Sequence, residues 1–302
     1  MVLVEEGTNS CSRGELPATL KRLFIVSCQK LESIAKSLHR NSFLESIDVR
    51  ECENLKALPT GIQSLSLLHD LFISDCPNLV PFPDGERVFL PPNFRYFCVD
   101  TGISSIREIT LPSNLTSLWI SRLEITEILL ESGLHRLSSL KMLKIDGGCP
   151  YLVSFPTPEM LLPTSLTSLS IASFPKLQNL SSEGLLILAS LKELFIVKCE
   201  ELTSFPEDGL PPSLLELHIV ACGKLTSFPE DGLPPSLLEL HIVACGKLTS
   251  FPNNGLPPSL LQLRITGCPL LEENCKKDLG REWSKIAHIP YVEIDGKFVY
   301  DA

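Results

Sequence analysis

The sequence is rich in side chains that could bind a metal, form disulfides or act as nucleophiles, since 11 cysteines and 6 histidines occur among 302 residues. His218 and His241 lie 23 residues apart in identical surroundings, which would place two imidazoles side by side if both sat on repeated elements. A metal centre needs further ligands that converge on the same point, and none with suitable spacing accompanies this pair. No C-x-x-C pair is present either. These side chains must therefore be interpreted through the elements that carry them.

An internal repeat governs those elements. Residues 202–224 read LTSFPEDGLPPSLLELHIVACGK, and residues 225–247 repeat these 23 residues without a change. The frame L-x-x-L-x-I-x-x-C-x-x-L-x-x-F-P recurs eleven times from residue 20, with start-to-start steps of 21 to 26 residues. This is the leucine-rich-repeat pattern. It predicts a repeat solenoid, a horseshoe with a parallel β-sheet on its concave face, a mostly non-helical convex face and a short C-terminal capping helix.

One repeat shows how the side chains are divided between core and surface. Apolar and polar residues alternate along the strand, so Leu217 and Ile219 should point inward and His218 outward. Cys222 follows the strand, where its S–H group can meet a backbone carbonyl of the turn. The same inward position is occupied by Cys28, Cys52, Cys76, Cys199, Cys222, Cys245 and Cys268, and by Cys149 if Gly147 and Gly148 absorb one inserted residue. Disulfides between successive repeats would be strained, so we expect free buried thiols and a reducing compartment.

The repeats set the domain boundaries. Residues 1–19 form a polar N-terminal extension that looks too weak to cap a hydrophobic edge, and residues 20–267 form about eleven repeats, irregular over 94–139, with a helix near residues 125–134. Paired prolines such as Pro211–Pro212 predict an extended outer segment, and Phe205, Phe228 and Phe251 should fill the outer edge of the core. Residues 268–302 form a C-terminal cap. Within the cap one amphipathic helix should bury one face, which carries Cys275, Leu279, Trp283 and Ile286.

Composition and motifs exclude several classes of function. The net charge is −10, which disfavours binding to nucleic acid or to anionic lipid. No apolar run is long enough to span a bilayer, and the N-terminus has acids at Glu5 and Glu6 instead of a basic signal-peptide region. A cytoplasmic location is therefore expected, and the alternative is a fragment whose targeting segment lies elsewhere. No G-x-S-x-G or H-E-x-x-H motif occurs, and an open curved sheet offers no enclosed pocket. We therefore expect a binding protein with no catalytic residues, no metal and no cofactor.

The candidate binding residues point outward from the strands on the concave face. Phe72, Tyr96, Trp119 and Phe195 are aromatic residues of the kind that anchors protein interfaces. A C-terminal patch combines Glu216 and Glu239 with His218, His241 and Arg264, and could bind a basic or polar segment of a partner. The alternative for the aromatic residues is that they shield neighbouring side chains or contact a domain outside this sequence. The alternative for the charged patch is a solvated face neutralised by its own histidines and arginine.

The repeat units and the C-terminal segment also carry a family resemblance. LELHIVACGKLTSFP and LFISDCPNLVPFP resemble the C-terminal leucine-rich repeats of plant intracellular nucleotide-binding immune receptors of the coiled-coil class. GCPLLEENCKKDLGREWSKIAHIPYVEIDG resembles the end of such receptors. The resemblance implies recognition of a pathogen effector or a host protein, and contact with the nucleotide-binding domain of a parent receptor. No G-x-x-x-x-G-K-[ST] phosphate loop is present, so binding of ATP or ADP does not carry over.

The leading hypothesis is therefore the recognition and autoregulatory repeat region of a plant immune receptor, acting in defense. A free-standing scaffold or a ubiquitin-ligase-type adaptor is the first alternative, although no F-box-like helical module precedes Leu20. An extracellular receptor ectodomain is the second, and it would carry a signal peptide, paired capping cysteines and a membrane span. An enzyme is the most distant alternative.

Overall fold

The computed structural model describes residues 2–3, 16–38, 43–80, 87–99, 108–121, 133–147, 150–157, 160–206, 208–229 and 232–300. The chain divides into two compact units, residues 1–143 and residues 144–302. Cys149 and most of the helix expected over residues 125–134 lie outside the described residues. No described helix is long and apolar enough to cross a membrane.

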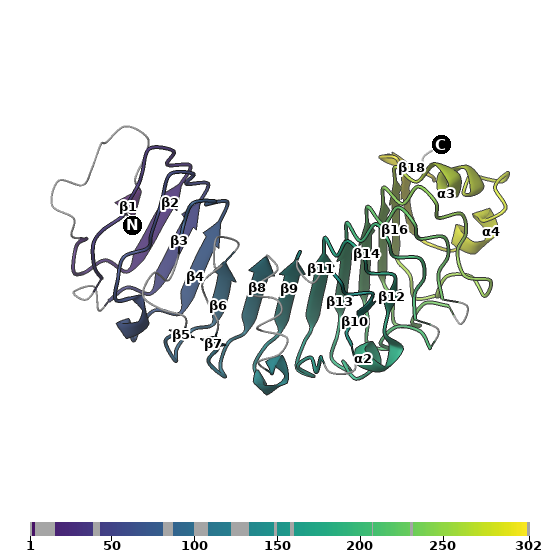
Figure 1. Cartoon of the computed structure of the whole chain (residues 1–302). Helices are drawn as coiled ribbons and strands as arrows, with labels where there is room; N and C mark the ends of the chain where they lie inside the picture. The colour runs from purple at the N-terminus through teal and green to yellow at the C-terminus, as the bar shows by residue number, and fades with distance from the viewer. Residues whose placement is uncertain are drawn as a thin grey trace. The chain divides into compact units, whose positions relative to one another are not determined.

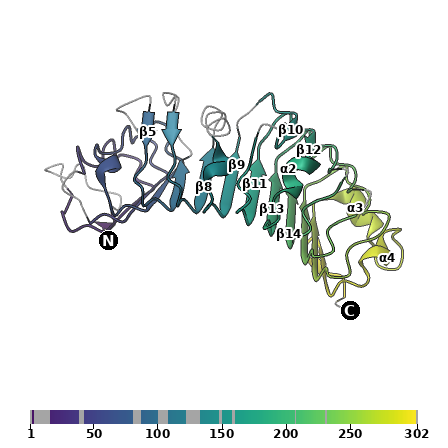
Figure 2. The ribbon, with the colours of Figure 1, turned by 90° about the horizontal axis from the view of Figure 1, so that it is seen from below.

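The first unit is a stack of short parallel strands (Figure 1). Its main sheet contains β1 (Val2–Leu3), β2 (Arg22–Val26), β3 (Ser46–Arg50), β4 (Asp70–Ser74), β6 (Tyr96–Val99) and β8 (Ser117–Ser121). The short strands β5 (Arg87–Phe89) and β7 (Glu108–Thr110) pair with each other away from that sheet (Figure 2). Two 3-10 turns, η1 (Ile62–Ser64) and η2 (Leu134–Arg136), follow Gly61 and Gly133. The N-terminal extension thus contributes a strand, because Val2 and Leu3 pair with Leu23 and Phe24 of β2.

The second unit has the same organisation. Its main sheet contains most of β9 (Met142–Asp146), then β11 (Ser168–Ala172), β13 (Glu193–Val197), β14 (Glu216–Val220), β15 (Glu239–Val243), β16 (Gln262–Thr266), β17 (Tyr291–Ile294) and β18 (Lys297–Phe298). Strands β11 to β17 pair in parallel, and β18 turns back antiparallel on β17. A second, short sheet pairs β10 (Ser154–Phe155) with β12 (Asn179–Leu180), and α2 (Ser182–Leu186) follows it. Repeating parallel strands with little helix confirm the predicted fold class.

The strands form because successive side chains alternate between the core and the outer surface. In β14, Leu217 and Ile219 are fully buried, and His218 between them is half-buried on the opposite face. Strands β13, β15 and β16 bury their second and fourth residues in the same way. One strand cannot bury its apolar face alone, so each rung of the stack completes the core of its neighbours. The inward and outward positions predicted from alternation are therefore confirmed.

The turn that leads to each of the seven cysteines at the repeated inward position has a feature that the repeat frame did not reveal. The residue before the cysteine adopts a left-handed conformation, with φ of 54° at Ala221 and 53° at Ala244. In this conformation the Ala221 N–H donates to the Val243 carbonyl of the next rung at 2.8 Å. The following thiol, that of Cys222, donates to the Val220 and Ile196 carbonyls at 3.7 and 3.9 Å. A backbone amide and a thiol thus join successive rungs at this corner.

The cysteine column is buried as predicted. The seven cysteines predicted at the repeated inward position, other than Cys149, are all reduced thiols, and none of them is more than 6% exposed. Burial raises the pKa of Cys199 to about 11, so this thiol keeps its proton at neutral pH. Cys52 differs because a hydrogen bond from Cys76 lowers its pKa to about 7.

The segments that return to the next strand complete the core without long helices. Phe205, Phe228 and Phe251 are at most 5% exposed and stack in a row, with ring centroids 5.6 and 6.0 Å apart. This confirms their predicted position at the outer edge of the core. Ser213 and Ser236, which follow the proline pairs, each donate a hydrogen bond to a carbonyl of the preceding rung at 2.7 Å.

The C-terminal cap corrects one expectation. The single amphipathic helix over residues 275–286 is replaced by two short helices, α3 (Pro269–Asn274) and α4 (Trp283–Ile286), joined by a tight loop. Cys275 and Ile286 are buried as predicted, but Leu279 is 86% exposed at the tip of that loop.

The reason for the break lies in the loop backbone. Asp278 has a φ of 60°, and a Cβ atom on Gly280 would lie 2.1 Å from the Asn274 carbonyl oxygen. The Glu282 N–H donates to that same carbonyl at 2.9 Å. The apolar spacing of 4 and 8 residues predicted a helix here. The chain does not form it, because a regular helix cannot include this close approach.

Candidate functional site

The outward surface of the parallel strands, called the strand face below, carries every candidate binding residue. In the first unit, Asp48 and Arg50 lie two residues apart on β3 and therefore on the same side of the sheet. Arg50 donates two hydrogen bonds to the Asp48 carboxylate, at 2.7 and 2.8 Å. The Arg50 guanidinium also lies 4.1 Å from the centre of the Phe72 ring. Asp48 is only 6% exposed although it lies on the outward side of β3, because Arg50 covers it.

Phe72, Tyr96 and Trp119 come together as one aromatic cluster. The Phe72 ring stacks on Tyr96 with centroids 6.1 Å apart, and Trp119 meets Phe72 edge-on at 5.7 Å. Phe72 and Trp119 belong to β4 and β8, and Cys98 of the intervening β6 is paired in register with both. The small Cys98 side chain leaves room for the two rings to meet.

Cys98 shares the outward side of β6 with Tyr96 and is nevertheless fully buried. Burial also raises the pKa of Tyr96 to about 12, so its hydroxyl remains a hydrogen-bond donor at physiological pH. Three half-buried aromatic residues on neighbouring rungs, with a guanidinium on one side, form a rigid amphipathic patch of the kind used in protein recognition. Sequence reasoning named the three rings but missed Arg50. Its position two residues after Asp48 was the available signal.

The second unit brings the rings of Phe195, His218 and His241 into one contiguous row. Phe195 and His218 have ring centroids 4.4 Å apart and nearly parallel planes, and His218 and His241 are 4.3 Å apart. The three residues are direct neighbours in register on β13, β14 and β15. Each imidazole approaches the glutamate of its own strand, with His218 3.6 Å from Glu216 and His241 3.4 Å from Glu239.

The environment keeps His241 neutral at physiological pH. Burial, followed by the neighbouring His218 and Arg264, lowers the pKa of His241 below 6.5. His241 therefore does not neutralise Glu239 at pH 7. Within the described residues no group of three or more His, Cys, Asp or Glu side chains could hold a metal ion.

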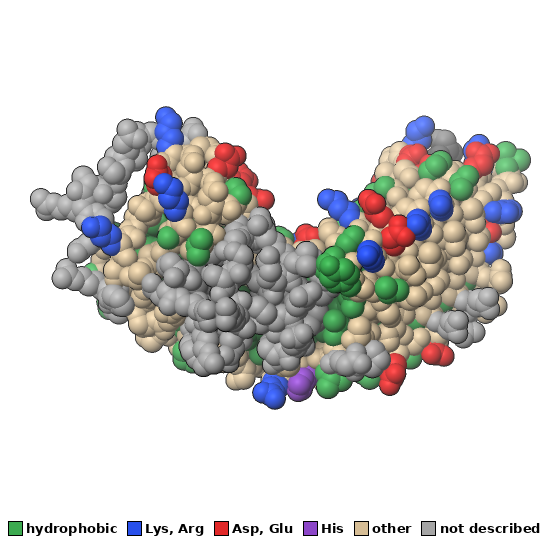
Figure 3. All heavy atoms as spheres, in the orientation of Figure 1, with side chains coloured by type: hydrophobic (Ala, Val, Ile, Leu, Met, Phe, Trp, Pro, Cys, Tyr) green, Lys and Arg blue, Asp and Glu red, His purple; other side chains and the backbone are tan. Residues whose placement is uncertain are grey.

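Arg264 belongs to the end of the same surface. It lies 3.4 Å from Glu293 and 5.5 Å above the ring of Tyr291, both on β17. Tyr291 in turn donates a hydrogen bond to Glu293 at 2.8 Å. β17 falls within the predicted cap, and Tyr291 and Glu293 were not among the predicted binding residues, although the alternation in YVEI is that of a strand. On the side of the second unit that Figure 3 shows, basic and acidic side chains are mixed. Lys224 also pairs with Glu201 at 2.6 Å.

Stacked parallel rungs, inward leucines and buried cysteines at seven of the corners together decide the architecture. The chain is a leucine-rich-repeat solenoid. A protein of Arabidopsis thaliana described as a candidate disease resistance protein is 38% identical to it over 101 residues. This match covers 33% of the repeat solenoid and 7% of the length of that relative. The solenoid is thus related to a disease resistance protein through part of its length.

Solved structures and family models add two further findings. The leucine-rich-repeat domain of the type III effector XopL is 22% identical, with a TM-score of 0.31, and the match covers 92% of this chain and 69% of that one. A leucine-rich-repeat protein from Bacteroides ovatus is 15% identical, with a TM-score of 0.24, over 82% of this chain and 79% of that one. No family model matches the sequence. The fold assignment therefore rests on the repeat geometry described above.

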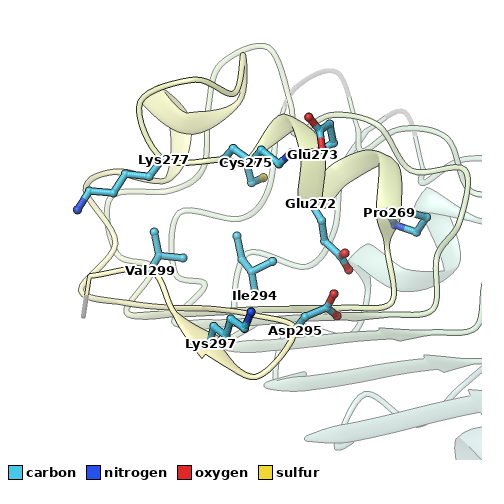
Figure 4. Close-up of a pocket in the computed structure, with 10 residues that line it drawn as sticks. Pro269, Glu272, Glu273, Cys275, Lys277, Ile294, Asp295, Lys297 and Val299 are labelled. Carbon is cyan, nitrogen blue, oxygen red and sulfur yellow. Dashed lines mark ion pairs between the residues drawn. The ribbon is translucent and has the colours of Figure 1, made fainter. Parts of the chain in front are cut away.

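The cap of the repeat solenoid contains a separate hollow of about 390 Å³ between α3 and the hairpin of β17 and β18 (Figure 4). The carboxyl groups of Glu272 and Asp295 face each other across its inner side. Glu272 accepts a hydrogen bond from the Cys268 N–H at 2.5 Å, and Asp295 accepts one from the Gly267 N–H at 3.0 Å. Each carboxyl group thus holds the backbone at the end of the last repeat. Burial, together with Asp295, raises the pKa of Glu272 above 4.5.

This pair makes a prediction for pH dependence. A raised pKa in the folded state means that the protonated Glu272 stabilises the cap at low pH and that this contribution is lost as pH rises through the folded pKa. Glu272→Gln keeps the uncharged form at every pH and can still accept the Cys268 N–H. We expect Glu272→Gln to raise the melting temperature at pH 7 by on the order of 2 °C and to leave it unchanged at pH 4. Thermal melts at the two pH values measure the difference.

Glu273→Gln is the matched control, because Glu273 is exposed and pairs with Lys276 of its own turn. An equal rise at pH 7 in the control variant would show that lower net charge, and not the carboxyl pair, is responsible.

Proposed function

We propose that this repeat solenoid is the protein-recognition and autoregulatory region of a plant intracellular immune receptor that acts in the cytoplasm in defense. The observation that supports it most directly is the match to a disease resistance protein of Arabidopsis thaliana. The cysteine-bearing repeats and the closing segment, which resemble the same class of receptors, support it further. A repeat region of this kind binds protein partners and not a nucleotide, and its chemistry lies in its exposed strand face.

The strand face supplies the contacts in this proposal. Phe72, Tyr96 and Trp119 form the aromatic anchor of the first unit, and Phe195 with His218 and His241 forms that of the second. Their partners are a pathogen effector or a modified host protein, and the nucleotide-binding domain of the parent receptor. Large, rigid rings lose little conformational entropy on binding, so they contribute more affinity than flexible side chains of similar size.

The test is binding in trans. The full chain is mixed with a separately produced nucleotide-binding module of an immune receptor from the same genome, and the affinity is measured by biolayer interferometry. We expect a specific complex that Trp119→Ala weakens by about 30-fold or more, as removal of an interface anchor does.

Tyr151→Ala is the matched control, because Tyr151 is an aromatic residue that is 79% exposed and lies in a turn instead of on a sheet strand. It should bind like the unchanged protein. A stable monomer that binds no such module would contradict the autoregulatory role and favour the scaffold or adaptor function.

A further inference from the structure

The strand face of the second unit has a regular division into three columns. On β13, β14 and β15 the first residue is a glutamate, the third is Phe195 or a histidine, and the fifth is a valine. The strands pair in register, so equivalent residues lie directly beside one another. We call this the three-column surface, with an acidic column, a ring column and a valine column. Its members are Glu193, Glu216, Glu239; Phe195, His218, His241; and Val197, Val220, Val243.

The ring column lies between the acidic column and the valine column and packs tightly along its length. The Phe195 and His218 rings are stacked with centroids 4.4 Å apart, and the His241 ring lies 4.3 Å from His218 with its plane tilted by 41°, so each ring packs against its neighbour. The glutamates and valines on either side are half-buried, which leaves part of each side chain available for contact. A partner that lies along the ring column would therefore contact the glutamate carboxylates on one side and the valine methyl groups on the other.

The charge on this surface is negative. No lysine or arginine forms an ion pair with the acidic column among the residues that the structure describes, and the nearby Arg264 is engaged by Glu293 at 3.4 Å. His241 is neutral at pH 7 because burial lowers its pKa. Carboxylates on adjacent rungs, about 4.8 Å apart, repel one another, and a cation placed along the column would relieve that repulsion. The acidic column is thus complementary to a basic partner.

The spacing of the rungs selects the conformation of that partner. Successive turns of an α-helix rise by about 5.4 Å, close to the rung spacing of about 4.8 Å. Same-face residues of an extended strand are about 6.6 Å apart and fall out of step with the rungs within two repeats. Lysines at positions i, i+4 and i+7 of a helix would each meet one glutamate. Apolar residues one position later would lie about 100° further round the helix, toward the valine column.

We propose that the three-column surface binds a basic amphipathic α-helix of a protein partner, which lies across the strands with its basic stripe on the acidic column and its apolar stripe on the valine column. This inference rests on the proposed recognition function and specifies the chemistry of one of its partners. The aromatic cluster of the first unit is not involved, so the two ideas can be tested separately.

The experiment uses the full chain and two synthetic peptides of identical composition. The first has lysines at i, i+4, i+7 and i+11 with leucines one position later, on an alanine-rich helical background. In the second, the same lysines and leucines alternate directly along one stretch, so that an extended strand would place all lysines on one face and all leucines on the other. Fluorescence anisotropy at about 50 mM salt measures both affinities. We expect the helical peptide to bind at least about 10-fold more tightly, with an affinity that falls as salt rises.

Variants locate the binding. The double variant Glu216→Gln/Glu239→Gln should weaken the helical peptide about 10-fold, and Val220→Ser/Val243→Ser should also weaken it. The matched control Glu53→Gln/Glu200→Gln removes two exposed acids away from the three-column surface and should bind unchanged. Thermal melts establish that all variants fold.

Two results would overturn the proposal. One is equal binding of the two peptides, and the other is equal weakening by the Glu216/Glu239 and Glu53/Glu200 double variants. Either of these, together with a retained effect of Trp119→Ala on the nucleotide-binding module, would refute the helix site and leave the recognition function standing. If Trp119→Ala has no effect on binding of the nucleotide-binding module while the helical peptide still binds, the recognition function is refuted and the helix site stands.

Discussion

Leu240→Ala is expected to destabilise the repeat solenoid by about 2–5 kcal/mol, because it removes a fully buried side chain from the centre of a shared core. Leu240 lies on β15, with Leu217 and Leu263 in the same inward position on the two neighbouring strands. The cavity would therefore weaken the packing of three rungs at once. The midpoint of urea unfolding, followed by circular dichroism, measures the loss.

Leu261→Ala provides the matched control in the adjacent repeat. Leu261 directly precedes β16 and is 53% exposed, so the same truncation should change stability by no more than about 0.5 kcal/mol. If the two variants unfold at the same urea concentration, the division of leucines into shared core and surface is wrong.

Gly280→Ala is expected to break the C-terminal cap. The added Cβ would lie 2.1 Å from the Asn274 oxygen and 2.7 Å from the Lys276 nitrogen, and both are backbone atoms that cannot rotate away. The loop between α3 and α4 would have to open, which releases Cys275 and Ile286 from the core. We expect a loss of about 3 kcal/mol or more, at the upper end of the range for overpacked sites. Amide hydrogen exchange should become faster in β16 and β17 before it does in β11.

The comparison variant is Gly246→Ala. Gly246 follows Cys245 in a turn where an added Cβ would meet nothing within 4 Å and where φ is not positive. It should keep the stability of the unchanged protein. Faster exchange in both variants would mean that glycine flexibility, and not the close approach at residue 280, controls the cap.

The sequence predicted the fold well because its information is repeated. The alternation around Leu217 and Ile219 and the spacing to Cys222 recur on neighbouring rungs, so each copy supports the interpretation of the next. The same redundancy explains why the seven cysteines at the repeated inward position were correctly placed in the core. The cap occurs only once, and the spacing of Cys275, Leu279 and Trp283 predicted a helix that a backbone contact at Gly280 prevents.

The candidate site was predicted only in outline. Alternation correctly placed Phe72, Trp119 and His218 on the strand face, because a period of two is a property of the chain itself. It could not show that Arg50 would cover Asp48 and lie over Phe72, or that Cys98 would be buried between two rings. Such contacts depend on the lengths and rotamers of neighbouring side chains, which no single strand determines.

The amino-acid sequence by itself determined which residues face inward, which face outward and how often the pattern returns, since these depend on local periodicity and on burial of apolar surface. Only the tertiary structure decided how the outward residues combine. The register between strands brings Phe195, His218 and His241 into one stack, and burial within that stack lowers the pKa of His241. Packing between residues distant in sequence also places Asp295 against Glu272. These effects arise from through-space contact, which the order of residues along the chain does not encode directly.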